Sequence, residues 1–242
     1  MNIPEKFTCI IPARYKSVRF LGKPLVDISG KSMICRVYDN ACESKFFNEV
    51  IVATDDEKIF KHCSDHDINY VCTSKDCPNG SERVAEVAAG IDAEYIFEMQ
   101  GDQPLVTKEV INDFITRAIF KLKENSEIDV VIPYAKATKE QENSIDVLKV
   151  VVDSNERLLF QTRQPIQTGY RTLGLYLWKK EALLRFAKLP ISNIEEVESS
   201  HPIRLYMNGF FVQGVELEGV DWVEVDREHQ VKEVEKILEK KQ

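Results

Sequence analysis

The sequence lacks an excess of positive charge and a long apolar run. Lysine and arginine number 32 against 40 aspartates and glutamates, so the net charge is −8, which argues against a surface built for nucleic acid. No apolar run has the length of a membrane span. Residues 1–6 lead into a strand-like run without the features of a signal peptide. We therefore expect a cytoplasmic protein with no membrane or nucleic-acid partner.

Paired-cysteine motifs are also absent. The six cysteines lie in the first third of the chain, and none forms a C-x-x-C pair. Their spacing suits neither a zinc ribbon nor a disulfide scaffold, so we interpret them as free and mostly buried thiols. His62 and His66 are four residues apart and would share one face of a helix. They lack a third ligand, so the sequence alone does not favour a metal site there.

What is present is the alternation of strands and helices typical of an α/β fold. Buried parallel strands read as continuous apolar runs, and the helices between them form the crossovers. The first half predicts strands at 7–11, 50–53, 69–72 and 95–99, separated by helices at 33–41, 57–64, 82–90 and 108–121. We predict a doubly wound, mostly parallel sheet within a single domain, residues 1–242.

The second half is less regular. Its apolar runs predict strands at 130–134, 148–152, 158–161, 173–178 and 210–217, with helices at 180–187 and 228–241. We interpret residues 130–175 as a small β-rich insertion in the α/β domain.

A basic loop follows the first predicted strand. Four cations and one glycine lie between Arg14 and Lys23, and such a loop can wrap a polyphosphate. A solvated basic loop explains this motif alone equally well. Two phosphate fingerprints are absent. Gly30-Lys31-Ser32 has Leu25 where a P-loop needs glycine, and no G-x-G-x-x-G follows the first strand, which argues against a dinucleotide oxidoreductase.

Two aspartates are candidate Mg²⁺ ligands. Asp102 follows the fourth predicted strand, and Asp226 precedes the final helix. Mg²⁺ usually takes one or two carboxylates and completes its shell with phosphates and water. Each aspartate has a structural alternative, because aspartate in such positions often caps a helix. For Asp226 considered alone, the helix cap is the stronger interpretation.

Several motifs occur in the order found in one enzyme family. They are the Pro-Ala-Arg-x-x-Ser-x-Arg-x-x-Gly-Lys-Pro loop, Ala53-Thr54-Asp55-Asp56, Gly80-Ser81-Glu82-Arg83, Gln100-Gly101-Asp102 and Val225-Asp226. Together they resemble the 3-deoxy-manno-octulosonate cytidylyltransferase (CMP-Kdo synthetase) family, from about residue 7 to 237. The resemblance implies the fold of nucleotide-diphospho-sugar transferases and an enzyme that transfers CMP from CTP to a 3-deoxy-ulosonic acid and releases pyrophosphate.

The resemblance also implies roles for individual residues. Those matching the family's nucleotide-binding positions are Pro12, Ala13, Arg14, Arg19, Lys23, Gly80, Ser81 and Arg83. The catalytic positions are Lys23, Asp102 and Asp226, of which the two aspartates hold Mg²⁺. Those matching the acceptor pocket are Gln100, Arg163, Tyr176 and Glu198. The family forms homodimers, and the insertion and residues 210–217 are candidate contacts.

The acceptor pocket departs from the family pattern. Thr172 stands where the family has histidine, and His201 and Pro202 replace a glutamate and a glutamine. A lost hydrogen-bond partner can change acceptor preference strongly. We therefore expect the acceptor to be Kdo or a modified Kdo, and the altered pocket raises the hypothesis that it is not ordinary Kdo. Two alternatives stay open: a cytidylyltransferase for another acidic acceptor such as a phosphonate, and a non-catalytic nucleotide-binding relative.

Overall fold

The computed structural model describes residues 6–17, 19–220 and 223–240. None of the helices among them is long and apolar enough to cross a membrane. The strands are β1 Phe7–Ala13, β2 Asp27–Ile28, β3 Lys31–Ser32, β4 Phe47–Thr54, β5 Tyr70–Cys72, β6 Tyr95–Met99, β7 Val130–Lys136, β8 Lys149–Val152, β9 Leu158–Thr162, β10 Tyr170–Thr172, β11 Leu175–Lys179 and β12 Val212–Glu216. The helices are the short 3₁₀ helix η1 Lys23–Leu25, α1 Met33–Cys42, α2 Glu57–Asp65, α3 Gly80–Ala88, α4 Lys108–Glu124, α5 Lys139–Asn143, α6 Lys180–Phe186, α7 Asn193–Glu198, α8 Ile203–Met207 and α9 Glu228–Lys240.

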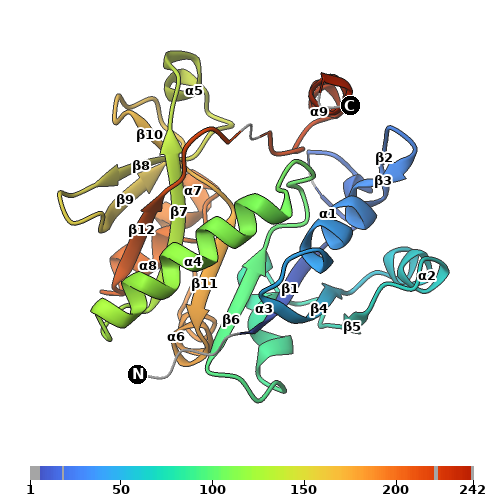
Figure 1. Cartoon of the computed structure of the whole chain (residues 1–242), viewed down its shortest axis with the longest axis horizontal. Helices are drawn as coiled ribbons and strands as arrows, with labels where there is room; N and C mark the ends of the chain where they lie inside the picture. The colour runs from blue at the N-terminus through green and yellow to red at the C-terminus, as the bar shows by residue number, and fades with distance from the viewer. Residues whose placement is uncertain (1–5, 18, 221–222, 241–242) are drawn as a thin grey trace.

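One ten-stranded sheet runs through both halves of the chain (Figure 1). Its order is β5-β4-β1-β6-β11-β7-β10-β8-β9, and β12 pairs with β7 off this path. The first four strands in this order are parallel, as the sequence predicts. The α/β class is therefore confirmed.

The sheet is mixed, whereas the sequence predicts a mostly parallel one. Strand β11 runs antiparallel to both β6 and β7, and β10, β8 and β9 continue the sheet in antiparallel pairs. Apolar runs of this kind give no direction, so an antiparallel strand at the centre of the sheet reads like a parallel one. The strands of the β-rich insertion thus extend the central sheet.

Local signals set the helix starts. Ser32, Asp56 and Asn79 each precede a helix and accept a hydrogen bond from a backbone N–H in its first turn. The cap at Asn79 begins α3 at Gly80, two residues before the predicted start. This places the glycine-containing turn directly at the end of the sheet where ligands bind in such folds.

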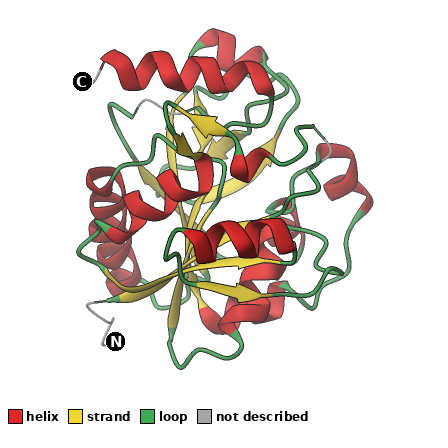
Figure 2. Ribbon diagram, turned by 90° about the vertical axis from the view of Figure 1, so that its right-hand side faces the viewer, coloured by secondary structure: helices red, strands yellow, loops and turns green. Residues whose placement is uncertain are grey.

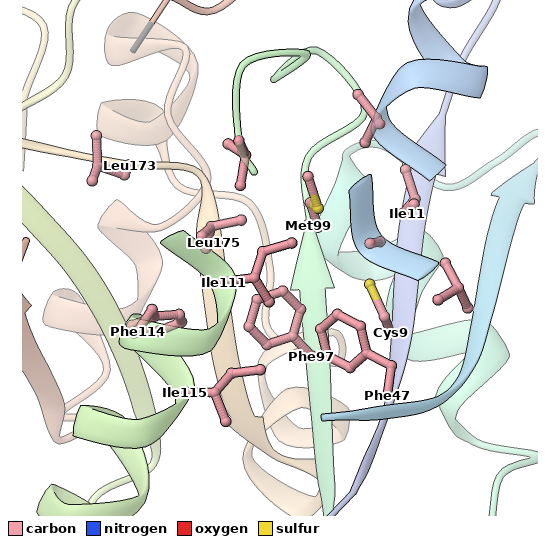
Figure 3. Packing of buried hydrophobic residues seen from close by; sticks show 14 of the residues in the cluster. Cys9, Ile11, Phe47, Phe97, Met99, Ile111, Phe114, Ile115, Leu173 and Leu175 are labelled. Atoms are coloured by element: carbon pink, nitrogen blue, oxygen red, sulfur yellow. The ribbon is translucent and has the colours of Figure 1, made fainter. Parts of the chain in front are cut away.

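Successive residues of the central strands face opposite sides of the sheet and feed two cores. Cys9 and Ile11 pack on the side of α1 and α4, and Ile10 packs on the side of α3 and α6. Figure 2 shows helices on both sides of the sheet. Figure 3 shows Phe97 at the centre of the first core, where its ring lies 4.9 Å from that of Phe47 and 5.9 Å from that of Phe114.

Two further expectations need correction. Of the six free cysteines, only Cys9, Cys35 and Cys63 are buried. Residues 210–217 were candidates for a dimer contact, but β12 lies inside the molecule against β7, and its apolar side chains are buried. An apolar run by itself does not distinguish an internal strand from an interface strand.

Candidate active site

A cleft of about 760 Å³ opens at the end of the sheet where the parallel strands terminate. It brings together most of the residues that the sequence singles out. Those that line it are Pro12, Ala13, Arg14, Arg19, Lys23, Gly80, Gln100, Asp102, Arg163, Tyr176 and Asp226. The basic loop after β1 forms one wall, and the acceptor-side residues come from the second half of the chain.

Backbone contacts hold the segments that carry Asp102 and Asp226 close together. The Val225 amide donates a hydrogen bond of 2.9 Å to the Asp102 carbonyl. Gly101 lies so close to the end of β1 that a Cβ there would be 2.9 Å from the Pro12 carbonyl oxygen. The end of β1, the loop after β6 and the segment before α9 therefore meet at one point.

The carboxylates of Asp102 and Asp226 converge on the ammonium of Lys23. Its Nζ lies 2.7 Å from Asp102 Oδ2 and 2.8 Å from Asp226 Oδ1. Arg19 binds the other oxygen of Asp226 at 2.9 Å. Burial lowers the pKa of Lys23, but the charges of the two carboxylates outweigh this effect, so its pKa is raised. Burial likewise raises the pKa of Asp226, but the charges of Lys23 and Arg19 outweigh it, so its pKa is lowered. Lys23 is thus bound to the carboxylate pair rather than free in the phosphate-binding wall.

The helix-cap alternatives for both aspartates are wrong. The N-cap of α4 is Thr107, not Asp102. The amides of Asp226 and Arg227 donate to the side-chain oxygen of Gln230, and the Asp226 carboxylate is engaged by cations. Both carboxylates are therefore available to face the cleft.

This donor set fits a divalent cation. Two carboxylates already share one positive charge, and oxygen ligands of this kind are those that Mg²⁺ takes in proteins. Glu224 adds a third carboxylate to the same wall. Burial and the charges of Asp102 and Asp226 raise the pKa of Glu224 to about 7. No sequence motif marks Glu224 as a site residue, although it stands two residues before Asp226.

Of the three predicted nucleotide-binding residues in α3, one lines the cleft and two are buried. Gly80 faces the cleft beside Gln100, and a Cβ there would lie 3.1 Å from the Gln100 side-chain oxygen. Ser81 and Arg83 are fully buried behind this wall. Arg83 pairs with Asp55 at 3.1 Å, which ties α3 to the end of β4. Their positions do not support the prediction that Ser81 and Arg83 bind the nucleotide directly, because the Ser81 hydroxyl is bound to buried Glu98 and Arg83 is paired with Asp55.

A buried polar network lies below the acceptor side. Glu98 accepts hydrogen bonds from Ser81, Gln100 and the indole of Trp178. Burial raises the pKa of Glu98 to about 7, although these hydrogen bonds act to lower it. The Ser81 hydroxyl also lies 2.8 Å from His201 Nε2. Burial, followed by the charges of nearby arginines, lowers the pKa of His201 to about 3, so its ring is neutral at pH 7.

Arg163 and Glu198 were both predicted to line the acceptor pocket, but only Arg163 lines the cleft. Arg163 lines the cleft, and one of its terminal nitrogens donates to the Asp146 carbonyl at 2.8 Å. Glu198 is buried and accepts bonds from Thr162 Oγ1 and the Arg163 amide at 2.9 and 2.7 Å. It therefore positions the Arg163 backbone and does not face the cleft, a role that its position in the sequence does not reveal.

The family model for cytidylyltransferases matches residues 8–216. The chain belongs to the cytidylyltransferase family. Among curated proteins it is 37% identical over 212 residues to a 3-deoxy-manno-octulosonate cytidylyltransferase of Chlamydia pneumoniae, covering 81% of this chain and 82% of that protein. It is 34% identical, over an alignment 260 positions long, to the Geobacter sulfurreducens protein of the same name, covering 99% of each.

Solved structures agree with this assignment. A CMP:2-keto-3-deoxy-manno-octonic acid synthetase complexed with CTP superposes with a TM-score of 0.87 at 26% identity, covering 98% of this chain and all of that one. A putative glucose-1-phosphate thymidylyltransferase from Bacillus anthracis shares the fold, with a TM-score of 0.72 at 12% identity over 96% and 94% of the two chains. The cytidylyltransferase is a nucleotidyltransferase of the CMP-Kdo synthetase family.

Proposed function

We propose that this cytidylyltransferase transfers CMP from CTP to a 3-deoxy-ulosonic acid, Kdo or a modified Kdo, and releases pyrophosphate. The observation that carries the proposal is the convergence of Asp102 and Asp226 beside the basic loop, with Arg163 lining the same cleft. A hydroxyl oxygen of the acceptor forms a bond to the α-phosphorus, the bond from that phosphorus to the bridging oxygen breaks, and the hydroxyl proton is released.

The chain's own residues position the reactants and neutralise charge, which is the main need of phosphoryl transfer. Gly80 lacks a side chain and leaves room beside Gln100 for the nucleotide. Arg14 and Arg19 line the same cleft, where their charges would neutralise the charge that develops on the leaving pyrophosphate. Arg163 offers paired N–H donors to the acceptor's carboxylate. Mg²⁺, held by Asp102 and Asp226, would supply polarisation of the α-phosphate.

The altered pocket favours a modified acceptor as the second candidate. The Ser81 hydroxyl donates to the Glu98 carboxylate, so the short contact with His201 is satisfied when His201 Nε2 carries the proton. His201 Nδ1 then keeps a lone pair and no charge, in place of the negative carboxylate that the family pattern has there. An uncharged nitrogen that accepts hydrogen bonds at this position suits a substrate with an additional or different hydrogen-bond donor.

An acceptor panel tests the proposal. We would measure pyrophosphate release with CTP and Mg²⁺ and, in turn, Kdo, an amino-substituted Kdo, other ulosonic acids and small phosphonates. Release with a 3-deoxy-ulosonic acid supports the proposal, and release only with a phosphonate contradicts it. Binding of CTP without release for any acceptor would identify a non-catalytic relative.

The variant His201→Glu tests the role of the neutral ring. It restores the carboxylate of the family pattern, so we expect the ratio of kcat/KM for plain Kdo over the modified acceptor to rise. An unchanged ratio would show that His201 does not set acceptor preference.

A further inference from the structure

A second cluster of metal-ligating side chains lies outside the cleft. Cys35 of α1, His62 of α2 and His66, the residue directly after α2, place one ligand atom each within 4.8 Å of one another. None of the three lines the active-site cleft. The sequence shows only the histidine pair. The third ligand, Cys35, lies on α1, 27 residues before His62 in the sequence.

The spacing within the cluster already approaches that of a metal site. Cys35 Sγ lies 3.3 Å from His62 Nε2, and the rings of His62 and His66 have centroids 4.1 Å apart. Ligands around a tetrahedral zinc ion are about 3.3–3.6 Å apart, given zinc–sulfur and zinc–nitrogen bonds of about 2.3 and 2.0–2.1 Å. Small side-chain movements would therefore complete the site.

His66 is held as a metal ligand usually is. His66 Nδ1 lies 2.8 Å from the backbone carbonyl of His62, to which it donates when it carries the proton. That bond leaves the Nε2 lone pair of His66 for a metal, and a carbonyl partner of this kind is the usual outer contact of a ligating histidine. Ser32 Oγ lies 2.8 Å from His62 Nε2, the nitrogen that also lies 3.3 Å from Cys35 Sγ, so a metal ion bound to that nitrogen would replace the Ser32 contact.

The donor set selects the class of ion. One thiolate and two imidazoles suit zinc and related transition ions, whereas Mg²⁺ requires oxygen ligands. We propose that Cys35, His62 and His66 bind one divalent transition-metal ion of the zinc class, with water in the fourth position. Cys35 is buried and His66 is exposed, so the ion enters from the solvent side of α2.

A metal here would join α1 to α2 near the basic loop. Lys58 of α2 lies over the ring of Tyr15 in that loop, 4.2 Å from its centroid. Tyr15 in turn contacts the position of Gly22, just before Lys23. The ion would therefore stabilise the side of the molecule that carries the basic loop without touching the carboxylates of the cleft.

Cobalt binding to the full chain tests the proposal. The chelator-treated, reduced protein is titrated with Co²⁺, and the near-ultraviolet thiolate-to-cobalt band and visible tetrahedral bands are recorded. We expect one equivalent with a thiolate band, displacement by Zn²⁺, and a rise in the unfolding temperature. Cys35→Ser should remove the band, and His62→Gln and His66→Gln should weaken binding at least about 10-fold.

Matched controls separate this site from the others. Cys42→Ser changes an exposed thiol on the same helix, and His229→Gln changes an exposed histidine on α9; both should bind like the wild type. Asp102→Asn should also keep the band, because cobalt bound to the cleft has no thiolate ligand. No thiolate band in the wild type, or a band that survives both Cys35→Ser and His66→Gln, would overturn the proposal. Since His66 is exposed, its variant should fold even if Cys35→Ser does not.

Discussion

Lys23 is the residue on which the acidic centre depends. Its ammonium neutralises Asp102 and Asp226, whose carboxylates would otherwise repel each other at close range. Only 14% of the Lys23 side chain is exposed, so the pair is screened little by solvent. The same two carboxylates therefore serve two cations: the lysine in this structure, and Mg²⁺ in the proposed reaction.

Replacing Asp102 tests the catalytic role of the pair. Asp102→Asn removes one electrostatic stabiliser, so we expect turnover to fall at least ~100-fold. The measurement is pyrophosphate release at saturating CTP and Mg²⁺. The control is Asp113→Asn, which loses only an exposed pair with Arg117 on α4. Turnover near that of the wild type would remove Asp102 from the mechanism.

Replacing Lys23 tests the exchange of cations. Lys23→Met leaves two carboxylates without their partner, and we expect a loss of about 2–3 kcal/mol in unfolding free energy, below the cost for a fully buried pair. Added Mg²⁺ should raise the unfolding temperature of this variant more than that of the wild type. Lys61→Met, which loses only an exposed pair with Asp65, should change little. Equal Mg²⁺ shifts in variant and wild type would contradict the cation site.

The lowered pKa of His201 predicts a pH effect on stability. The unfolded chain takes up a proton near pH 6.5, but the folded ring does so only near pH 3. Stability is therefore lost as pH falls from about 6.5 towards 3. His201→Gln should lose less, by about 1–2 kcal/mol at pH 5 relative to pH 7.5, measured by urea unfolding. His229→Gln, at an exposed site, should follow the wild type; parallel profiles for all three proteins would refute the prediction.

At the scale of elements, the site depends on how closely three chain segments approach. The loop after β6 lies against the end of β1 at Gly101, and the segment before α9 is hydrogen-bonded to the β6 loop. Helix α9 secures that segment, since Val231 and Val234 are buried in the core and Gln230 binds its amides. The elements thus carry Asp102 and Asp226 to one place from opposite ends of the sequence.

Gly101→Ala tests this approach. The new Cβ would lie 2.9 Å from the backbone oxygen of Pro12, so the loop after β6 must move away from the end of β1. We expect a stability cost of about 1–3 kcal/mol and turnover lower by about 10- to 100-fold, because the loop carries Asp102. Gly90→Ala is the control, since its nearest contact would be 3.7 Å. An active and fully stable Gly101→Ala enzyme would show that the loops adjust freely.

At the scale of the whole molecule, the terminal strand β9 is the candidate contact between copies. Within the described residues β9 ends the strand order, and it exposes Leu159 and Phe160. Exposed strand edges with apolar side chains need a cover. Because β12 is internal, the β-rich insertion is the candidate contact that remains for the expected homodimer.

Light scattering with size-exclusion chromatography tests the dimer. We expect twice the chain mass of 27.8 kDa for the wild type and a monomer for the double variant Leu159→Arg with Phe160→Lys. Phe120→Arg changes an exposed apolar residue on α4, away from β9, and should stay dimeric. A monomeric wild type, or an intact dimer in the double variant, would contradict this contact.

Local patterns in the sequence determined the early elements and the basic loop. The apolar runs predict β1, β4, β5 and β6, and the caps at Ser32 and Asp56 mark helix starts. These features depend on neighbours a few residues apart, which a sequence displays directly. The same patterns place the polar motifs at strand ends, and so predict which edge of the sheet forms the site.

Contacts between distant segments were decided by the tertiary structure. The pairing of Lys23 with Asp226 spans 203 residues, the direction of β11 emerges only from the strands beside it, and Cys35 joins the histidine pair through helix packing. Glu198 was expected in the cleft but is buried. No local spacing encodes such outcomes, because they depend on how whole elements pack around a shared core and on which charges must be neutralised there.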